Sequence, residues 1–199
     1  MDDLIQKNVP AAEAYQSDRR GFLKHGLAFS AALGFWMPSL AEARSFSGNA
    51  PAKGRNIHFI NAHTNEVFQG EYWYDGRYIP SAFKEIKTVL RDFRTDTTYP
   101  IDPRLMDILF VVQRRLDNFR PFTVFSGYRS PATNEMLRER SHGVARGSLH
   151  MQGQAIDLNL PGTHLHHLRQ AAVHLRSGGV GYYPQSDFVH VDTGRVRYW

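Results

Sequence analysis

Residues 148–157 read SLHMQGQAID, and they place a histidine just before a predicted strand and an aspartate within it. Side chains alternate along a strand, so Asp157 faces one side while Ile156 and Leu158 face the other. An acid backed by apolar residues in this way lies at the boundary of a core. The loop before the strand can fold the imidazole of His150 back over the carboxylate.

A second predicted strand, near the end of the sequence, carries another histidine. Residues 187–192 read DFVHVD, in which His190 points away from its two flanking valines. If this strand lies beside the first, His190 and Asp157 converge. Two imidazoles and one carboxylate leave the fourth tetrahedral position of zinc open for water, which is the ligand count of a catalytic site. The sequence therefore predicts one Zn²⁺ ion held by His150, Asp157 and His190.

Each of these residues, taken alone, also fits a structural role. A strand histidine is commonly hydrogen-bonded in the core or at the surface, and a strand aspartate commonly accepts a bond from a backbone amide. The complete pattern favours the metal site, because zinc polarises a carbonyl group and lowers the pKa of its water to about 7, as amide hydrolysis requires. The sequence has no cysteine, which excludes thiolate nucleophiles, disulfides and Cys-ligated zinc.

Length and composition indicate one compact catalytic domain. The chain has 199 residues, of which 42% are hydrophobic, enough for a single ordinary core. Its formal net charge of +5 favours anionic partners, which include nucleic acid, anionic lipid and acidic cell-wall polymers. No dense run of Lys and Arg and no nucleic-acid-binding motif accompanies the charge, so we expect no nucleic-acid partner.

The N-terminal region has the pattern of a cleavable export signal. Residues 17–24, SDRRGFLK, place a twin arginine ahead of an apolar stretch at 26–37 that is too short for a membrane span. Ala41 and Ala43 are the small residues that a signal peptidase reads. We expect residues 1–43 to be a twin-arginine signal peptide, recognised by the twin-arginine translocase. An N-terminal helix or an uncleaved anchor is the alternative.

Cleavage after this signal defines the expected location and the domain boundaries. Removal of residues 1–43 leaves 20 Lys and Arg against 14 Asp and Glu, a net charge of +6. We expect the mature protein to be basic, periplasmic and without a stable membrane span. Residues 44–54 are rich in Ser, Gly, Ala and Pro and lack periodicity, which predicts a flexible leader. Residues 55–199 form the predicted catalytic domain.

The order of the predicted elements indicates an α+β fold. Aromatic and β-branched runs at 57–60 and 71–74 predict an antiparallel pair, and apolar residues at three- and four-residue steps predict helices over 81–93 and 102–118. The later elements are strands at 122–125, 155–160, 180–183 and 188–192, a helix from 130 and a helix over 163–176. We therefore expect helices packed on a small, mainly antiparallel sheet.

Several ordered motifs resemble a known family. They are SxHxxGxAxD at residues 148–157, SGYRS at 126–130, GVGYYP at 179–184 and FVHVDTG at 188–194. Together they resemble the murein endopeptidase K-like zinc peptidases, which are related to the D-alanyl-D-alanine carboxypeptidases. The resemblance covers nearly the whole chain, including the export signal. It implies a hedgehog/D-Ala-D-Ala-peptidase-like fold and a periplasmic zinc enzyme that hydrolyses peptide cross-links of peptidoglycan, and His150, Asp157 and His190 match its three ligand positions.

The same resemblance implies two further catalytic residues. An arginine belongs on the turn after the strand at 122–125, and Arg129 fits, since a guanidinium can bind a substrate carboxylate bidentately or stabilise an oxyanion. Its motif also suits a turn, so a structural role in holding backbone carbonyls stays open. In the wider group an acid three positions before the last histidine ligand acts as the base. Asp187 occupies that position, although strand alternation points it away from His190 unless a bulge redirects it. Asp192 or a chain of waters is the alternative base.

Three more residues are candidates for substrate binding. Tyr128 and Tyr183 are candidate walls of a cleft, with a structural role as the alternative for each. His142 is close in sequence to the predicted site, and we expect it either to contact the substrate or to hold a metal-ligand side chain in place. A further group of histidines lies on one predicted helix, where a solvated face accounts for it: His164, His166, His167 and His174.

These observations lead us to expect a zinc endopeptidase acting on cross-linked murein peptides. A carboxypeptidase that trims terminal D-alanine is the alternative within the same chemistry. A non-catalytic, metal-containing protein that binds the cell wall is the alternative of another class. The cleaved bond, between D-alanine and diaminopimelate or between two diaminopimelates, depends on pocket shape, which sequence patterns do not encode.

Overall fold

The computed structural model describes residues 53–140 and 143–199. The predicted signal peptide, nearly all of the predicted leader and His142 therefore lie outside the described residues. The first strand begins at Gly54, next to the predicted domain boundary at residue 55. Within the described ranges, no helix has the length and apolar character that crossing a membrane needs.

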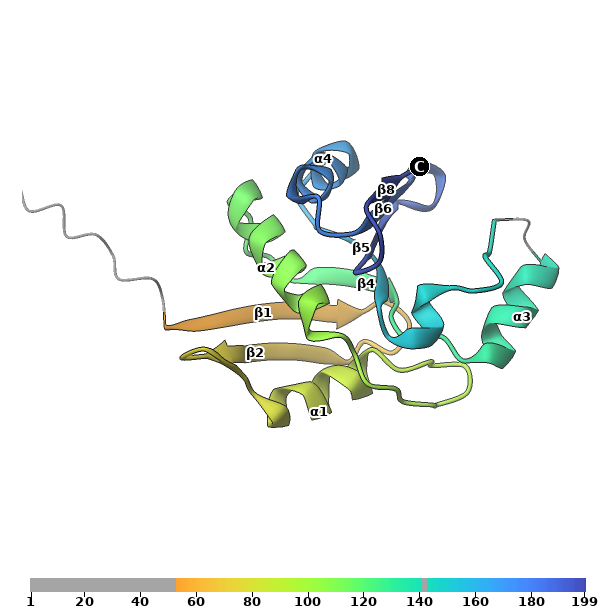
Figure 1. Ribbon diagram of the computed structural model, residues 1–199, viewed down its shortest axis with the longest axis horizontal. Helices are drawn as coiled ribbons and strands as arrows, with labels where there is room; N and C mark the ends of the chain where they lie inside the picture. Colours follow the sequence, from red (N-terminus) through yellow and green to blue (C-terminus); the bar gives the residue numbers. More distant parts are fainter. Residues whose placement is uncertain (1–52, 141–142) are drawn as a thin grey trace, which may run out of the picture. The chain divides into compact units, whose positions relative to one another are not determined.

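The described strands form one eight-stranded sheet in the order β3-β2-β1-β4-β5-β7-β6-β8 (Figure 1). They are β1 (Gly54–Asn61), β2 (Val67–Tyr74), β3 (Arg77–Tyr78), β4 (Phe122–Ser126), β5 (Ala155–Asn159), β6 (Gly179–Tyr183), β7 (Phe188–Asp192) and β8 (Arg197–Tyr198). The pairs β1–β4 and β6–β8 are parallel, and the other pairs are antiparallel. The α+β class is confirmed. The sheet has two strands more than expected, β3 and β8, because two-residue edge strands are too short to show a sequence period.

Four α-helices accompany the sheet in the described residues: α1 (Pro80–Val89), α2 (Pro103–Leu116), α3 (Pro131–Arg140) and α4 (Leu165–Leu175). The side chain of Asp102 caps α2 by accepting the backbone N–H of Arg104 at 3.0 Å, as the predicted N-cap requires. The helix predicted over 81–93 ends earlier, at Val89. The cause is Asp92, whose carboxylate accepts the backbone N–H of Arg94 at 3.0 Å and so favours a turn over another helical bond.

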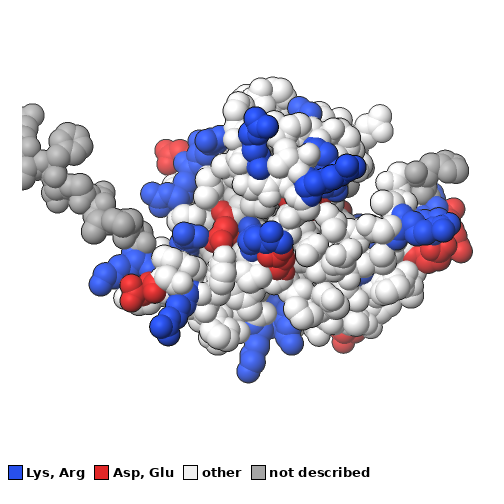
Figure 2. Space-filling view, viewed as in Figure 1, with Lys and Arg blue, Asp and Glu red and all other residues white. Residues whose placement is uncertain are grey.

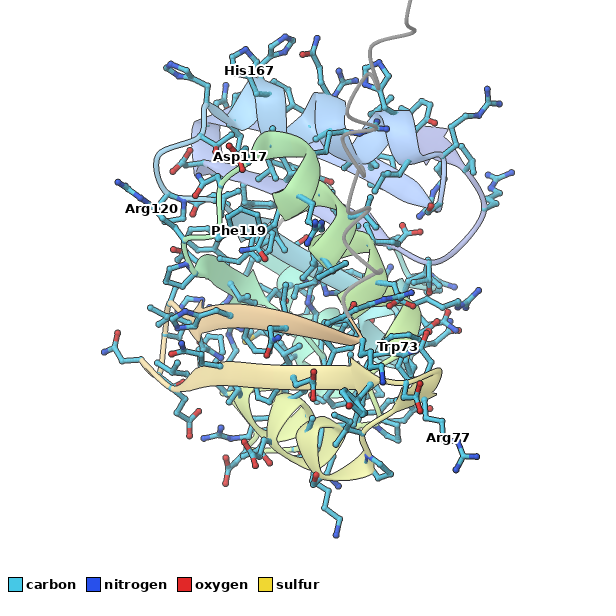
Figure 3. The ribbon with its side chains drawn as sticks, turned by 90° about the vertical axis from the view of Figure 1, so that its left-hand side faces the viewer. Trp73, Arg77, Asp117, Phe119, Arg120 and His167 are labelled. Atoms are coloured by element: carbon cyan, nitrogen blue, oxygen red, sulfur yellow. The ribbon has the colours of Figure 1, made fainter. Side chains whose placement is uncertain are left out.

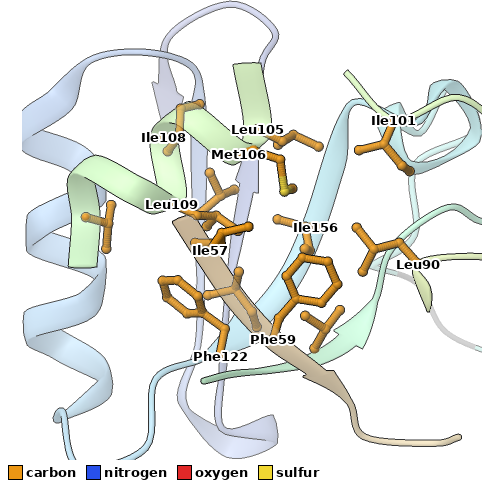
Figure 4. Close-up of a cluster of buried hydrophobic side chains, with 14 of the residues drawn as sticks. Ile57, Phe59, Leu90, Ile101, Leu105, Met106, Ile108, Leu109, Phe122 and Ile156 are labelled. Atoms are coloured by element: carbon orange, nitrogen blue, oxygen red, sulfur yellow. The ribbon is translucent and has the colours of Figure 1, made fainter. Parts of the chain in front are cut away.

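One hydrophobic core joins the helices to the sheet. Helix α1 packs on β2, α2 packs on β1, and α4 packs on β6 and β7. Figure 4 shows the central cluster, in which apolar residues of three strands meet those of α2: Ile57, Phe59, Phe122, Ile156, Leu105 and Leu109. Burial of a side chain of this size stabilises a fold by about 1.5–3 kcal/mol. Because β5 and β7 direct their apolar residues into this core, their polar residues face the opposite side.

Candidate metal centre

Four neighbouring strands carry one row of paired residues on the face opposite the core. Ser126 of β4 pairs with Asp157 of β5, Asp157 pairs with His190 of β7, and His190 pairs with Gly181 of β6. Side chains of directly paired residues lie next to each other on the same face of a sheet. The pairing of β5 with β7 therefore brings Asp157 and His190 together, as the sequence predicts.

An irregularity in β4 places Ser126 in this row. Between Val124 and Ser126 the register with β5 shifts, so that two residues of β4 span one step of β5. In a regular strand Ser126 shares the core-facing side with Val124, and the extra residue turns it to the other side. The hydroxyl of Ser126 then accepts a hydrogen bond from Nη2 of Arg129 at 3.2 Å.

The residues around His150 fix the position of its imidazole. The short 3₁₀ helix η1 (Leu149–Gln152) begins after Ser148, whose hydroxyl accepts the backbone N–H of His150 at 3.4 Å. It ends at Gly153, where φ is 63° and a Cβ would collide with the carbonyl oxygen of Pro100. Glycine is thus required for the turn that leads into β5. The turn brings His150 back over Asp157.

Three side chains converge through one ligand atom each. Nε2 of His150 lies 3.2 Å from Oδ2 of Asp157 and 3.2 Å from Nδ1 of His190. Nδ1 of His190 lies 2.8 Å from Oδ1 of Asp157. All three residues are buried, and one ligand atom from each lies within 4.8 Å of the others. No other group of three or more His, Cys, Asp or Glu meets this spacing within residues 53–140 and 143–199.

The second nitrogen of each imidazole has a partner outside the group. Nδ1 of His150 donates to the carbonyl oxygen of Gly127 at 2.7 Å, and Nε2 of His190 donates to Oδ2 of Asp192 at 3.1 Å. With these nitrogens protonated, the opposite nitrogens can present lone pairs to a metal ion once Nδ1 of His190 has given up its own proton. The donor set is two imidazole nitrogens and a carboxylate, which fits a divalent metal ion with an open position.

Asp192 is a fixed acceptor rather than a group that faces the cavity. It is fully buried, and its Oδ1 accepts the backbone N–H groups of Gly179 at 3.0 Å and Gly194 at 2.9 Å. Arg197 donates to its Oδ2 at 2.7 Å. Burial alone raises the pKa of Asp192, but the bonds from His190 and Arg197 outweigh burial and hold this pKa well below its usual range. Asp192 therefore orients His190 and is not placed to act as a base.

The protonation of His150 and His190 is coupled to the binding of a cation. Burial alone lowers the pKa of His190, but hydrogen bonds to Asp157 and Asp192 outweigh it and raise the pKa to about 9. Burial lowers the pKa of His150, and the charge of Asp157 opposes this only in part. A metal ligand must be deprotonated, so an ion at this position replaces the proton of His190.

A family model described as peptidoglycan L,D-endopeptidase MepK matches residues 49–199. The chain belongs to this family. Its sequence is 40% identical to that of the peptidoglycan L,D-endopeptidase MepK of Escherichia coli K12 over 189 residues. The match covers 94% of this chain and 100% of that protein. The MepK of Shigella flexneri shows the same identity and coverage. A MepK relative from Haemophilus influenzae is 40% identical over 148 residues, which is 74% of this chain and 80% of that protein. The resemblance inferred from the sequence motifs is confirmed.

A cavity of about 520 Å³ opens in front of the three ligand residues, and Arg129 lines it. Nη2 of Arg129 lies 3.4 Å from Oδ2 of Asp157, and the arginine side chain is only 12% exposed. Its Nε is buried without a hydrogen-bond partner among the described residues. Burial lowers the pKa of Arg129, and the charge of Asp157 opposes that effect. The guanidinium of Arg129 contacts the side chains of Ser126 and Asp157. Within the described residues, it does not bind the backbone carbonyls that a purely structural role would require.

The other predicted site residues, Tyr183, Tyr128 and His142, do not all lie at the cavity. Tyr183 lines the cavity, as expected for a cleft wall. Tyr128 does not; it is buried and stacks on Tyr99 with ring centroids 5.0 Å apart, so it packs in the interior. The predicted place of Tyr128 at a cleft wall stays a prediction. His142 lies outside the described residues, and its role stays a prediction.

Asp187 does not reach the cavity. It follows the short helix η2 (Pro184–Ser186), it is exposed, and its φ is 53°. Its carboxylate accepts a hydrogen bond from Nδ2 of Asn159 at 2.9 Å, at the end of β5. The turn, rather than strand alternation, sets the direction of this acid: Asn159 shares the face of Asp157, so the carboxylate of Asp187 lies on that side of the sheet but outside the cavity.

The cavity residues that the sequence did not predict include Phe188, Arg197 and Trp199. Phe188 stacks on Tyr183 with ring centroids 4.6 Å apart, and the ring of Trp199 lies 5.3 Å from that of His190. Phe188 carries a usable signal, because two-residue spacing puts it on the same face as His190. Arg197 and Trp199 carry none, because β8 is too short to show alternation.

Proposed function

We propose that this protein is a zinc-dependent peptidoglycan L,D-endopeptidase. The observation that carries the proposal is the buried group of His150, Asp157 and His190 in a chain of the MepK family. Each imidazole of the group is oriented by a hydrogen bond to a residue outside it. The relatives' names supply the substrate and the bond type, an amide that joins a residue of L configuration to one of D configuration. The ligand atoms supply the reason to expect zinc, since two imidazoles and one carboxylate form a catalytic zinc ligand set.

The metal and Arg129 have separate roles in this proposal. His150, Asp157 and His190 hold the ion, which when bound supplies the Lewis acidity that polarises a carbonyl group and lowers the pKa of water. Arg129 lies beside them with its guanidinium oriented by Ser126. It binds a carboxylate of the substrate or the oxyanion that develops during hydrolysis. Tyr183 and Phe188 form the aromatic wall against which the peptide packs.

The cavity offers no acidic side chain as a base outside the proposed ligand set. Asp157 is the only Asp or Glu among the described residues that line the cavity, and it belongs to that set. Asp187 takes part only if the turn after η2 rearranges when substrate binds. We keep Asp187 as a candidate because of its position relative to His190 in the sequence, and the variant described in the Discussion tests it.

We infer that the protein acts in the periplasm. The support is the twin-arginine pattern with its apolar stretch and small-residue cleavage site, in residues 1–43. A net charge of +5 suits an acidic cell-wall polymer. Figure 2 shows Lys and Arg side chains at several separate places on the visible face, so the charge on this face is not gathered into one patch.

Digestion of defined substrates tests the proposal. Peptidoglycan dimers joined by a diaminopimelate–diaminopimelate link, which is an L,D bond, and dimers joined by a D-alanine–diaminopimelate link are incubated with the protein. Parallel samples contain a chelator, or a chelator followed by excess zinc, and mass spectrometry resolves the products. We expect L,D-linked dimers to become monomers without free D-alanine, loss of cleavage with the chelator, and recovery with zinc.

Each other outcome rejects a part of the proposal. Free D-alanine indicates the carboxypeptidase alternative. Cleavage that survives complete removal of metal excludes zinc dependence. Retained binding to peptidoglycan without any product contradicts the enzyme assignment and favours the non-catalytic alternative.

A further inference from the structure

Trp199 is fixed at the edge of the sheet beside the metal-ligand group. Its backbone N–H donates to the carbonyl oxygen of Val180 at 3.2 Å, and its own carbonyl oxygen accepts the N–H of Tyr182 at 3.0 Å. A Cβ at Gly181 would lie 2.6 Å from Cε2 of the indole, so the ring occupies the space that the glycine leaves. Gly181 pairs with His190 across the ladder. The indole therefore lies over the same row of the sheet as the ligands.

Arg197 covers the indole of Trp199. The guanidinium carbon of Arg197 lies 4.9 Å from the ring centroid, within the range of a cation–π contact. Arg197 is itself held by Asp192, the residue that orients His190. The ring of Trp199 is nonetheless open to the cavity, since the residue is 46% exposed. Trp199 is thus held in place by its neighbours and remains accessible to a substrate.

The hydrogen bond between Trp199 and Tyr183 has only one direction. Nε1 of Trp199 donates to the hydroxyl oxygen of Tyr183 at 2.8 Å. An indole N–H only donates, whereas a phenol hydroxyl both donates and accepts. The Tyr183 oxygen is the acceptor in this bond and keeps its own proton for a second partner. No protein acceptor for that proton is present among the described residues.

The ring of Tyr183 is fixed as well. It stacks on Phe188 with ring centroids 4.6 Å apart and an angle of 24° between the planes. Both residues line the cavity together with His150 and His190. Stacking fixes the ring and the indole fixes the oxygen, so the remaining hydroxyl proton is free to be donated into the cavity.

We propose, on the basis of the proposed function, that Trp199 is a positioning residue for Tyr183. The indole N–H holds the phenol oxygen, and Tyr183 donates its hydroxyl proton to a carbonyl oxygen of the peptide substrate. Arg129 binds the charged oxygens of the substrate in the same cavity, so the cavity offers one neutral and one charged donor. The pair thereby contributes to selecting the peptide and its orientation relative to the metal ligands.

A double-mutant cycle tests this role. Trp199→Phe removes the N–H and keeps an aromatic ring, and Tyr183→Phe removes the hydroxyl and keeps the stacking on Phe188. We expect each single variant to lower kcat/KM for the L,D-linked dimer about 3- to 30-fold. We expect the double variant to be no worse than Tyr183→Phe alone, because the N–H acts only through the hydroxyl. Metal content and the unfolding midpoint should stay at their wild-type values.

A matched control and a second measurement keep the test decisive. Trp73 lies on β2, away from the site strands (Figure 3), so Trp73→Phe should leave kcat/KM unchanged. The same cycle is repeated by equilibrium binding of the dimer to chelated protein, in which no cleavage occurs. If wild-type protein binds the dimer but cleaves no peptidoglycan, the proposed function fails while the binding cycle still reports on the pair. Full activity and full affinity of Trp199→Phe, or losses that multiply in the double variant, overturn the proposal.

Discussion

The two faces of the β5–β7 pair are built from adjacent residues but are held by different forces. On one face, Ile156 pairs with Val191 and contributes to the hydrophobic core through contacts that have no preferred direction. On the other, Asp157 pairs with His190, and each polar atom depends on a particular partner. The comparison shows that stability and chemistry can be altered separately, one residue apart on the same strand.

The largest expected effect is the loss of the metal when a ligand is removed. His190→Ala takes away Nδ1 and leaves His150 and Asp157 as an incomplete pair. We expect stoichiometric zinc and activity to fall below detection in metal analysis and in the dimer assay. Val191→Ala, on the other face of β7, is the matched control and should keep one zinc per folded chain. Retention of both zinc and activity by His190→Ala would refute the ligand set.

The next largest effect belongs to the core face and should change stability alone. Ile156 is fully buried, so Ile156→Ala should lower the free energy of unfolding by about 2–5 kcal/mol. Ile156→Val, which removes one methylene, should lower it by about 0.5–1.5 kcal/mol. Urea denaturation measures both. A loss of zinc per folded chain in either variant would show that the two faces are not independent.

A smaller effect is expected from the residue that orients His190. Asp192→Asn keeps the shape of the side chain but removes the charge that accepts from Nε2 of His190. Such partners of metal-bound histidines contribute about 10- to 100-fold to metal affinity or activity. Competition with a chromophoric chelator gives the zinc affinity. An unchanged affinity would mean that the position of His190 is set by its strand alone.

The polar face should also give the chelated protein a dependence on pH that the core face lacks. The folded pKa of His190, about 9, lies above the unfolded value of about 6.5. The resulting stabilisation is complete below about pH 6.5 and is lost as the pH rises through about 9, an effect on the order of 3 kcal/mol. Urea unfolding in excess chelator at pH 6, 7.5 and 9 measures it. Stability that increases over this range contradicts the assignment, and zinc-loaded protein should not show the loss.

The smallest effect is expected at Asp187. Its carboxylate binds Asn159 outside the cavity, so Asp187→Asn should change kcat/KM by less than about threefold. A general base contributes about 10²- to 10⁴-fold, so the two roles differ clearly in the dimer assay. A loss within the larger range would restore Asp187 as the base and require the turn after η2 to move during the reaction.

Local patterns predicted the parts of the site that depend on strand alternation and turn chemistry. The spacing from His150 to Asp157 and the alternation around His190 predicted which side chains share a face, and the pairing of β5 with β7 then brings these side chains together. The long helices were predictable because their period is a property of a single segment, although α1 ends early where Asp92 forms a turn. Segments with a strong period therefore gave reliable positions.

The surroundings of some site residues depend on contacts between distant segments. Tyr128 sits in a motif that matches the family, yet its ring packs on Tyr99, which no local pattern reveals. Trp199 enters the site because β8 pairs with β6 and because Gly181 leaves room for the indole. Both cases need the tertiary structure, since neither stacking nor vacant space has a signature in a single segment.

The irregularity of β4 means that the loss of one residue would not move Ser126 away from the site. Deletion of Phe125 would leave Ser126 directly after Val124, and alternation along a regular strand would still place Ser126 on the side opposite Val124, beside Asp157. The hydroxyl would then keep its place next to the guanidinium of Arg129. In a comparison of relatives, a gap of one residue at Phe125 is therefore compatible with an unchanged site.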